Sequence, residues 1–586
     1  MTQTCLFLFL TLLGFLGSLS PLILIPSYKI IVLLSGAIFL FFVLSLAQRN
    51  EMRRKPFSFT PLTILFLLFL LWSALGYIYS ADPEKSILLT IQALSGVLLY
   101  LGLTLHIRNK NQLKTILQVL LFFGGILALI GLIQQFPIPF LENPISRGSN
   151  STSLFVHRNV FAGYLLFVIP LSCLIYFSDS TKIWKFVAAI SFILSCTALE
   201  FSGSRGGKLV FLLEVALIIG YLILKKDRKK FTPLIQGCIL AVFLFFIIDF
   251  IIKGLGVDSH HTTHCTYITC KRFYAWGQSL SRVLFWQGAW EIFKDHWLIG
   301  SGPLSFAMLF PKYYISVIPL LDGLALISGN PPHAHNLFLQ TASDSGLLGI
   351  GLLLGFLALF YWRAYKLLLN SKFKTQTTVF YITLAITSFL LHSIIEYNWP
   401  GPIFIYHFTI FIFVINFSEQ EQISFKGINP STKFSNIVPA FGILVLLFSL
   451  VLSVRFYEYH RILDENFLKE KNFYELKSWL AQAKEVCPRC DRPHLKVAEI
   501  LLERYKANPN KKLLKAAKSE LLEGHNLNPY NPYYLGYLGQ ILVVQGDYDR
   551  ALSLIKEAAK FNRTHHINPL DLSAEQLRKL DHAKSR

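Results

Sequence analysis

Residues 331–349 read Pro-Pro-His-Ala-His-Asn-Leu-Phe-Leu-Gln-Thr-Ala-Ser-Asp-Ser-Gly-Leu-Leu-Gly, and an apolar segment follows from Gly346 to Phe360. The first half is polar and contains a His-X-His-Asn cluster at 333–336. Ionisable side chains are costly inside a bilayer, and histidine can exchange a proton near neutral pH. The stretch therefore predicts a helix that enters a membrane and places polar chemistry at the membrane edge.

The composition of the whole chain agrees with a membrane protein. Of its 586 residues, 53% are hydrophobic and 15% are charged, and the mean hydropathy is +0.49. Segments of bilayer length recur and predict about 13 spans. They cover 4–26, 29–47, 61–80, 86–106, 114–135, 155–177, 182–201, 206–224, 234–252, 346–368, 378–396, 402–417 and 438–456. From residue 457 onward the chain is polar. The predicted fold is an all-α polytopic helix bundle with a large outer loop at 253–345 and a C-terminal helical domain.

Basic residues alternate between the loops of this bundle. Most lie in every second loop, for example the Lys225–Lys230 run, and this asymmetry predicts that those loops and the N-terminus are cytoplasmic. The loop at 253–345, the 201–208 turn and the C-terminal domain then lie outside. Part of the net charge of +21 comes from these basic loops, whose residues set the orientation in the membrane, so the charge does not argue for nucleic-acid binding.

The cysteines fit this topology. Cys5, Cys173, Cys196 and Cys238 fall in apolar spans, where cysteine is a small core residue. Two close pairs lie on the outer side, Cys265/Cys270 and Cys487/Cys490. Pairs in an oxidising compartment suggest disulfides, and half of a zinc site is the weaker alternative for Cys487/Cys490.

The C-terminal segment 457–586 contains small residues at helix-pair spacing. Leu538, Gly539, Gly546, Ala551 and Ala558 occupy positions where a tetratricopeptide unit packs closely, and a second unit ends at 528–529. Such units bind peptides or proteins, and a helical cap without a ligand is the alternative. The sequence Asp547-Tyr548-Asp549 imitates a metal signature, but turn chemistry explains it better.

Two arginines on the outer side are candidate anion ligands. Arg205 lies in Ser202-Gly203-Ser204-Arg205-Gly206-Gly207, where small residues let an anion approach closely; a tight turn is the alternative. Arg282 lies among aromatic and basic residues typical of an amphipathic helix at the lipid headgroups.

Four further polar positions flank these arginines. His333 or His335 is a candidate general base, although a histidine that caps the next helix is the alternative. Asn336 orients a substrate or satisfies the local backbone. His392 and Glu396, one helical turn apart, either support the catalytic histidine or form a membrane-edge pair, and the spacing favours the pair.

Other polar groups give weaker signals. Glu214 and Asp249 are isolated acids in predicted spans, and the sequence names no partner for either. The tract from Asp258 to Cys265 contains three histidines but no second ligand group, so the sequence favours no metal site.

From about residue 155 to 400 the chain resembles the O-antigen ligase and polymerase superfamily of bacterial envelope glycosyltransferases. The resemblance rests on Asn159 to Pro170, on Arg205 with Leu209 as Arg-X3-Leu, on Arg282 to Trp286, on Gly300-Ser-Gly302 with Phe306, and on His335 with Gly346 as His-X10-Gly. It implies an enzyme of the bacterial inner membrane, part of lipopolysaccharide biosynthesis. The enzyme would transfer a glycan from undecaprenyl diphosphate to an acceptor hydroxyl on the periplasmic face, with no metal or other cofactor. Arg205 and Arg282 would hold the diphosphate, His335 would be the base, and His333, Asn336, His392 and Glu396 would support it.

The resemblance and the spans together predict four parts. They are N-terminal helices at 1–150, a ligase-like core at 151–420, a cytoplasmic linker with the last span at 421–456, and a periplasmic tetratricopeptide-like domain at 457–586. The extra domain leaves the acceptor open. Lipid A–core is slightly favoured over protein Ser/Thr, with chain polymerisation third. The non-enzyme alternative is a glycolipid transporter with a docking domain, but a transporter would place its polar residues near mid-membrane.

Overall fold

The computed structural model describes residues 27–47, 60–107, 109–136, 151–155, 157–178, 180–254, 268–317, 331–399, 401–425, 437–463 and 472–561. Within these residues the chain forms helices and no strand. The predicted span 4–26, Cys5, Cys265 and the histidine tract at 258–265 lie outside the described residues, as does the side chain of Cys270.

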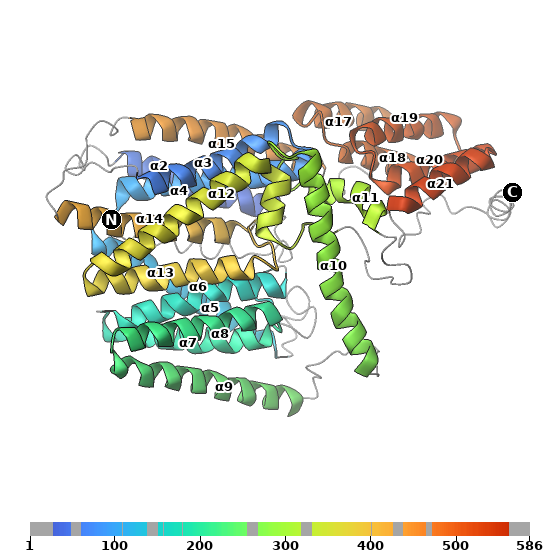
Figure 1. Cartoon of the computed structure of the whole chain (residues 1–586). Coiled ribbons are helices and arrows are strands. Elements are labelled where there is room, and N and C mark those ends of the chain that lie inside the picture. The colour runs from blue at the N-terminus through green and yellow to red at the C-terminus, as the bar shows by residue number, and fades with distance from the viewer. Residues whose placement is uncertain are drawn as a thin grey trace.

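The membrane part is a bundle of long apolar helices that run roughly side by side (Figure 1). Its helices are α2 (Ser27–Ala47), α3 (Pro61–Leu75), α4 (Pro83–His106), α5 (Lys110–Ile133), α6 (Arg158–Phe177), α7 (Lys182–Phe201), α8 (Arg205–Leu224), α9 (Phe231–Gly254), α12 (Leu337–Asn370), α13 (Phe373–His392), α14 (Pro402–Phe425) and α15 (Ile437–Ile462). Nine of the described helices are long and apolar enough to cross a membrane, and the chain is a multi-pass membrane protein.

The helices differ in how much lipid they can contact. In α4, 94% of the apolar window is buried, whereas the corresponding share in α9 is 17%. α4 is therefore a central helix and α9 a peripheral one. As predicted for core cysteines, Cys173 and Cys196 are buried. Asp249 finds a partner one turn away, since its Oδ2 lies 2.6 Å from Lys253 Nζ. Glu214 is fully buried in α8.

One predicted span boundary is wrong. The span placed at 378–396 ends as a helix at His392, so Glu396 lies beyond it. The span placed at 346–368 is the second part of a helix that begins at Leu337 and is broken at Gly346, where the span was predicted to begin.

The helix α12 is broken at Gly346, where φ is 64°. The segment 297–302 crosses this break and pairs with it: Ser301 N donates to Ser343 O (2.9 Å), and Leu347 N donates to Trp297 O (2.7 Å). These bonds satisfy backbone groups that a kink would otherwise leave without partners. A Cβ on Gly346 would lie 2.4 Å from the backbone carbonyl of Leu298. The glycine of the His-X10-Gly pattern is therefore required both by its dihedral angles and by this close approach.

We expect Gly346→Ala to destabilise the protein by about 1–3 kcal/mol, because it forces an L-residue into a left-handed conformation and against a backbone. Gly351→Ala is the matched control, since it lies on the same helix and a Cβ there meets nothing within 4 Å. Thermal unfolding in detergent measures both. Equal melting temperatures for the two variants would contradict the structural role of Gly346.

Helices α10 (Ile268–Asp295) and α11 (Phe306–Val317) lie at one end of the bundle (Figure 1). In the second half of α10, Phe285 and Ile292 are buried, whereas the apolar side chains of Val283 and Trp290 are about half exposed (51% and 49%). The prediction of an amphipathic helix at the lipid headgroups stays a prediction. A small core joins α10 and α11 to the polar stretch before α12. It contains Phe285, Ala289, Ile292, Phe306, Leu309, Phe310, Tyr313 and Ala334.

The C-terminal helices form a second core at the same end of the bundle (Figure 1). They are α17 (Phe473–Val486), α18 (Arg492–Ala507), α19 (Lys511–Leu527), α20 (Pro532–Gln545) and α21 (Tyr548–Phe561). Their core begins at Tyr459, and Cys487 and Cys490 are joined by a disulfide. Gly546 ends α20 in a left-handed conformation, Asp547 follows in the turn, and Tyr548 and Asp549 begin α21, so the turn prediction is confirmed for Asp547 alone. The tetratricopeptide assignment itself stays a prediction.

This C-terminal domain is anchored to the membrane helices by charged contacts. Arg492 Nη1 lies 2.7 Å from Glu84 Oε1 at the start of α4, and Tyr459 donates to Glu84 Oε2 (2.9 Å). Arg489 donates to the backbone oxygens of Tyr77 and Ser80. The domain is thus held over the end of the bundle that carries α10 and α11.

Candidate functional site

A cavity of about 490 Å³ lies at this end of the bundle, where α6 and α8 begin. We call it the site cavity. Its lining brings together residues that are up to about 240 positions apart in the chain: His157, Arg158, Asn159, Gly203, Ser204, Arg205, Gly206, Leu209, Ser281, Arg282, Phe285, His335, His392, Ile395 and Glu396. Arg205, Arg282 and His335, the three residues predicted to carry the chemistry, all line it. Its charged lining comprises three guanidinium groups against one carboxylate, so the cavity favours an anion.

Arg205 is the first residue of α8 and is exposed to the cavity. The preceding turn is fixed by Ser204, whose hydroxyl accepts a hydrogen bond from Gly207 N (3.2 Å). A Cβ on Gly206 would lie 2.2 Å from the Ile395 side chain, so the small residues here serve close packing. The guanidinium stands at a helix N-terminus, where the helix dipole adds to the attraction for an anion.

Arg282 projects from α10, and its Nη2 lies 3.9 Å from Glu396 Oε2. Its side chain is 32% exposed, whereas that of Glu396 is 3% exposed. Because the pair is long and Arg282 is partly open to the cavity, its guanidinium can turn toward a ligand without leaving the field of Glu396.

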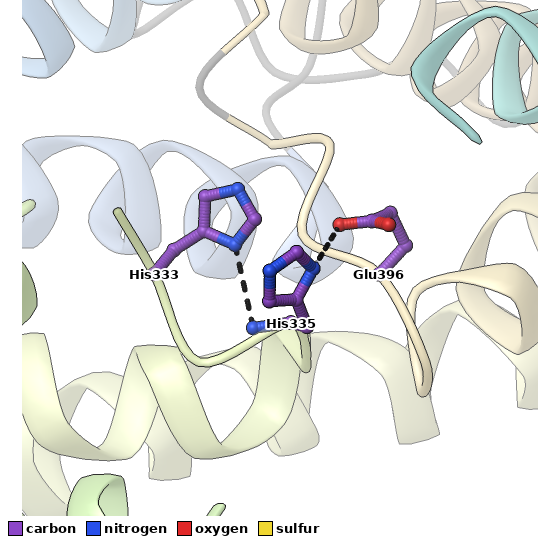
Figure 2. Close-up of side chains that lie close together, drawn as sticks. All are labelled: His333, His335 and Glu396. Carbon is purple, nitrogen blue, oxygen red and sulfur yellow. Dashed lines mark hydrogen bonds and ion pairs between the residues drawn. The ribbon is translucent and has the colours of Figure 1, made fainter. Parts of the chain in front are cut away.

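His335 is held by contacts on two sides. Its Nδ1 lies 2.6 Å from Glu396 Oε1 (Figure 2). Its ring stacks on Phe285 at 5.7 Å between centroids. The backbone of His335 has φ 51°, a strained conformation for a residue other than glycine. Contact of Nδ1 with a carboxylate favours the tautomer that carries its proton on Nδ1, which leaves Nε2 with a lone pair.

Glu396 is almost completely buried and lies at the centre of this network. Its Oε2 accepts from Asn159 Nδ2 (2.8 Å), and its Oε1 accepts from the backbone N–H of Tyr397 (3.2 Å). Burial alone would raise the pKa of Glu396, but the hydrogen bonds that it accepts from His335 and Asn159 hold that pKa well below its ordinary value. Glu396 is therefore a carboxylate across the physiological pH range.

His333 occupies a different position in the network. Its Nδ1 accepts a hydrogen bond from the backbone N–H of His335 (3.3 Å; Figure 2). Burial, together with the neighbouring His335, lowers the pKa of His333 to about 3. A neutral ring with its Nδ1 already engaged supports the conformation of His335, and it is a poor proton acceptor. This geometry agrees with the prediction of His335, rather than His333, as the base, and the assignment itself stays a prediction.

Asn336 caps α12, since its side-chain oxygen accepts from Phe338 N (2.9 Å) and Leu339 N (3.0 Å). Of its two predicted roles, the structure shows the backbone role. Gln340 acts in the same region: its Oε1 accepts from Ala334 N (2.7 Å), and its Nε2 donates to Asp344 (2.9 Å). These bonds fix the turn that carries His335.

The favoured interpretation of His392 and Glu396 as a membrane-edge pair is wrong. The helix α13 ends at His392, and Glu396 turns away to bind His335. His392 instead lies 3.2 Å from the side-chain amide of Asn398; it is buried and forms part of the cavity lining. Glu396 thus takes the alternative role that the sequence offered, which is support of the histidine.

Sequence reasoning gave no site role to His157, Arg158 and Asn159, which precede or begin α6. His157 caps α6 through Nδ1, Arg158 lines the cavity, and Asn159 binds Glu396. Three polar residues in a row at the outer end of an apolar helix were the available signal, but only the fold places them opposite Arg205.

His333, His335 and Glu396 each offer a ligand atom, and these atoms lie within 4.8 Å of one another. This spacing would accommodate a divalent cation. The contact between His335 and Glu396 already joins two of the three groups, and the cavity carries its own positive charge. Whether activity requires a metal is therefore a question for a chelation test.

Comparison with known proteins identifies one family. Residues 190–354 match the family model described as O-Antigen ligase. The matched region includes Arg205, Arg282 and His335 and ends before Glu396. No curated protein matches the chain significantly.

Proposed function

Because residues 190–354 match the O-Antigen ligase family model, we propose that the chain transfers a glycan from undecaprenyl diphosphate to an acceptor hydroxyl. The observation that carries this proposal is the site cavity, where two predicted phosphate ligands face a histidine held by a buried carboxylate. The cavity lies at the end of the bundle assigned to the periplasm by the basic loops, so the inner membrane is the proposed location.

In the proposed reaction, the acceptor oxygen attacks the anomeric carbon of the first sugar. The bond from that carbon to the diphosphate oxygen breaks, and undecaprenyl diphosphate leaves with the bonding electrons. The hydroxyl proton passes to Nε2 of His335. Attack opposite to the leaving group inverts the anomeric configuration.

Each charged residue has a separate task in this step. Arg205 and Arg282 stabilise the charge that develops on the leaving diphosphate. Glu396 orients His335 and stabilises the imidazolium that forms. A metal ion would supply positive charge next to the leaving diphosphate. The guanidinium groups of Arg205 and Arg282 supply that charge instead, and we therefore propose a metal-independent mechanism.

Lipid A–core is the proposed acceptor, which places the enzyme in lipopolysaccharide biosynthesis. A protein Ser/Thr hydroxyl is the second candidate, because the helical domain anchored through Arg489 and Arg492 stands over the same end of the bundle. Such a domain would suit a protein or peptide partner. Chain polymerisation is the third.

The test is a transfer assay with purified protein and radiolabelled glycan on undecaprenyl diphosphate, offering lipid A–core and delipidated protein acceptors in parallel. We expect label on lipid A–core, both with and without EDTA. Label on protein would show that protein, and not lipid A–core, is the acceptor. Polymerised donor would indicate a polymerase. Loss of activity in EDTA that returns with a divalent cation would contradict the metal-independent mechanism, and absence of any transfer would contradict the function.

Glu396→Gln tests the positioning role of the carboxylate. We expect transfer to fall by about 10²–10⁴-fold, since the amide cannot stabilise the imidazolium and permits the wrong tautomer. The depressed pKa of Glu396 means that its charge is present above the ordinary carboxyl range and is lost only as pH falls below it. The defect should therefore be similar at every pH from 5 to 8. A variant that matches the wild type at pH 5 would contradict this role.

A further inference from the structure

A second cavity, of about 450 Å³, lies between the membrane helices and the C-terminal domain. We call it the interdomain cavity. Its lining comes from the start of α4, from α11 and from the C-terminal helices: Asp82, Glu84, Lys85, Ala307, Met308, Pro311, Asp491, Arg492, Leu495, Asn528, Tyr530, Asn531, Pro532 and Tyr533. Neither the family match nor the predicted site residues assign it a role.

The interdomain cavity and the core beside the site cavity lie on different faces of α11. Phe306, Leu309, Phe310 and Tyr313 belong to the core that also holds Phe285 and Ala334, and Phe285 lines the site cavity as well. Ala307, Met308 and Pro311 line the interdomain cavity. These two sets follow helical spacing on separate sides, so α11 lies between the interdomain cavity and that core. A linear ligand that occupies both cavities would have to reach past α11, which is about 10–12 Å across with its side chains.

The charges of the interdomain cavity differ from those of the site cavity. Its lining carries three carboxylates against two cations, and these form pairs within the wall: Lys85 with Asp82 (3.2 Å) and Arg492 with Glu84 (2.7 Å). The cavity is therefore close to neutral but polar. Such a lining suits an uncharged polar ligand better than a phosphate or a charged peptide.

The remaining groups are those that bind sugars. Tyr530 and Tyr533 are half-buried and line the cavity, where an aromatic ring can pack on the apolar face of a pyranose. Each ring also packs against another aromatic ring, Phe561 for Tyr530 and Tyr537 for Tyr533, with 6.0 Å between centroids in both pairs. The amides of Asn528 and Asn531 also line the cavity, and both donate to Asp491 Oδ2 (3.0 and 3.4 Å). Planar groups fixed by one another are pre-organised partners for sugar hydroxyls.

We propose that the interdomain cavity is a remote subsite for an uncharged segment of a glycan chain, several sugars away from the transfer point. The choice of a glycan rests on the proposed function. The subsite gives the C-terminal domain a direct part in substrate recognition, because eight of the fourteen lining residues belong to that domain. The same chemistry would accept the chain of the donor or the sugars of the acceptor, so the experiment must separate them.

The binding test uses the full-length protein in nanodiscs and saturation-transfer difference NMR. One probe is the oligosaccharide released from undecaprenyl diphosphate by mild acid, and the other is core oligosaccharide freed of lipid A. We expect one of them to give a signal that Tyr533→Ala removes and Tyr533→Phe retains. Tyr474→Ala is the control, since Tyr474 lies in the same domain, is 82% exposed and does not line the cavity.

The kinetic test measures transfer by the same variants. Tyr533→Ala should raise the KM of the bound substrate by about 5-fold with kcat retained, because stacking lost far from the reacting atoms weakens ground and transition states alike. If an active Tyr533→Ala protein kept the wild-type KM and the wild-type NMR signal, the subsite proposal would fail and the proposed function would stand. A wild type that transfers nothing contradicts the proposed function, and the NMR signals still decide the subsite. Binding of neither glycan, or of an acceptor peptide instead, also overturns it.

Discussion

His335→Gln should lower the rate of glycan transfer by about 10²–10⁴-fold, the usual contribution of a general base. The substitution keeps the size and polarity of the side chain but removes the nitrogen that would take the proton. Since the donor is held by the arginines, its KM should change much less than kcat. Initial rates at saturating and limiting donor separate the two effects.

Two further histidine variants make this result specific. His333→Gln should lower the rate of glycan transfer much less, because glutamine can still accept the hydrogen bond from the backbone N–H of His335. His296→Gln, at the end of α10 and outside the lining of the site cavity, is the matched control. Equal losses of transfer rate in the His333→Gln and His335→Gln variants would contradict the assignment of His335 as the base. A fully active His335→Gln variant would rule His335 out as the base.

Removing either arginine should have the second largest effect. Arg205→Ala and Arg282→Ala should each reduce kcat by about 10²–10³-fold, as expected for loss of one group that stabilises developing charge. Arg282→Lys should recover little, because a lysine cannot offer two parallel N–H groups to a phosphate. The measurement is kcat and KM for the lipid-linked donor, with donor binding measured separately.

The control for the arginines is Arg550→Ala, whose side chain is 82% exposed on the C-terminal domain. It removes the same charge far from the site cavity and should leave transfer unchanged. If Arg205→Ala raised only KM, that arginine would bind the donor equally in the ground and transition states. If both variants retained wild-type kinetics, the site cavity would not be the diphosphate site.

Most of the helical framework could be predicted from the sequence. Twelve of the predicted apolar segments overlap described helices, because bilayer-length hydrophobic runs have few other stable structures. The candidate residues Arg205, Arg282 and His335 were found from motifs at span boundaries, and the fold brings all three to one cavity. Local patterns sufficed here because each motif lies within one segment.

The sequence failed where contacts join distant segments. Spacing suggested that Glu396 pairs with His392, but the end of α13 at His392 releases Glu396 to a histidine 61 positions away. The part played by Asn159 depends on the packing of α6 beside α13, and no periodicity contains that information. The different tasks of His333 and His335 follow from one backbone conformation, φ 51°, which the two-residue motif does not reveal.

The sequence by itself thus determined a multi-pass helical protein, its polar C-terminal domain and the residue types of its site, since hydrophobic length and local motifs depend on neighbours along the chain. Only the tertiary structure decided which carboxylate contacts His335, which arginines share its cavity, and that a polar cavity close to neutral is formed jointly by α4, α11 and the C-terminal domain. Those features depend on the packing of helices that are far apart in sequence, and that packing is set by the sum of many weak contacts.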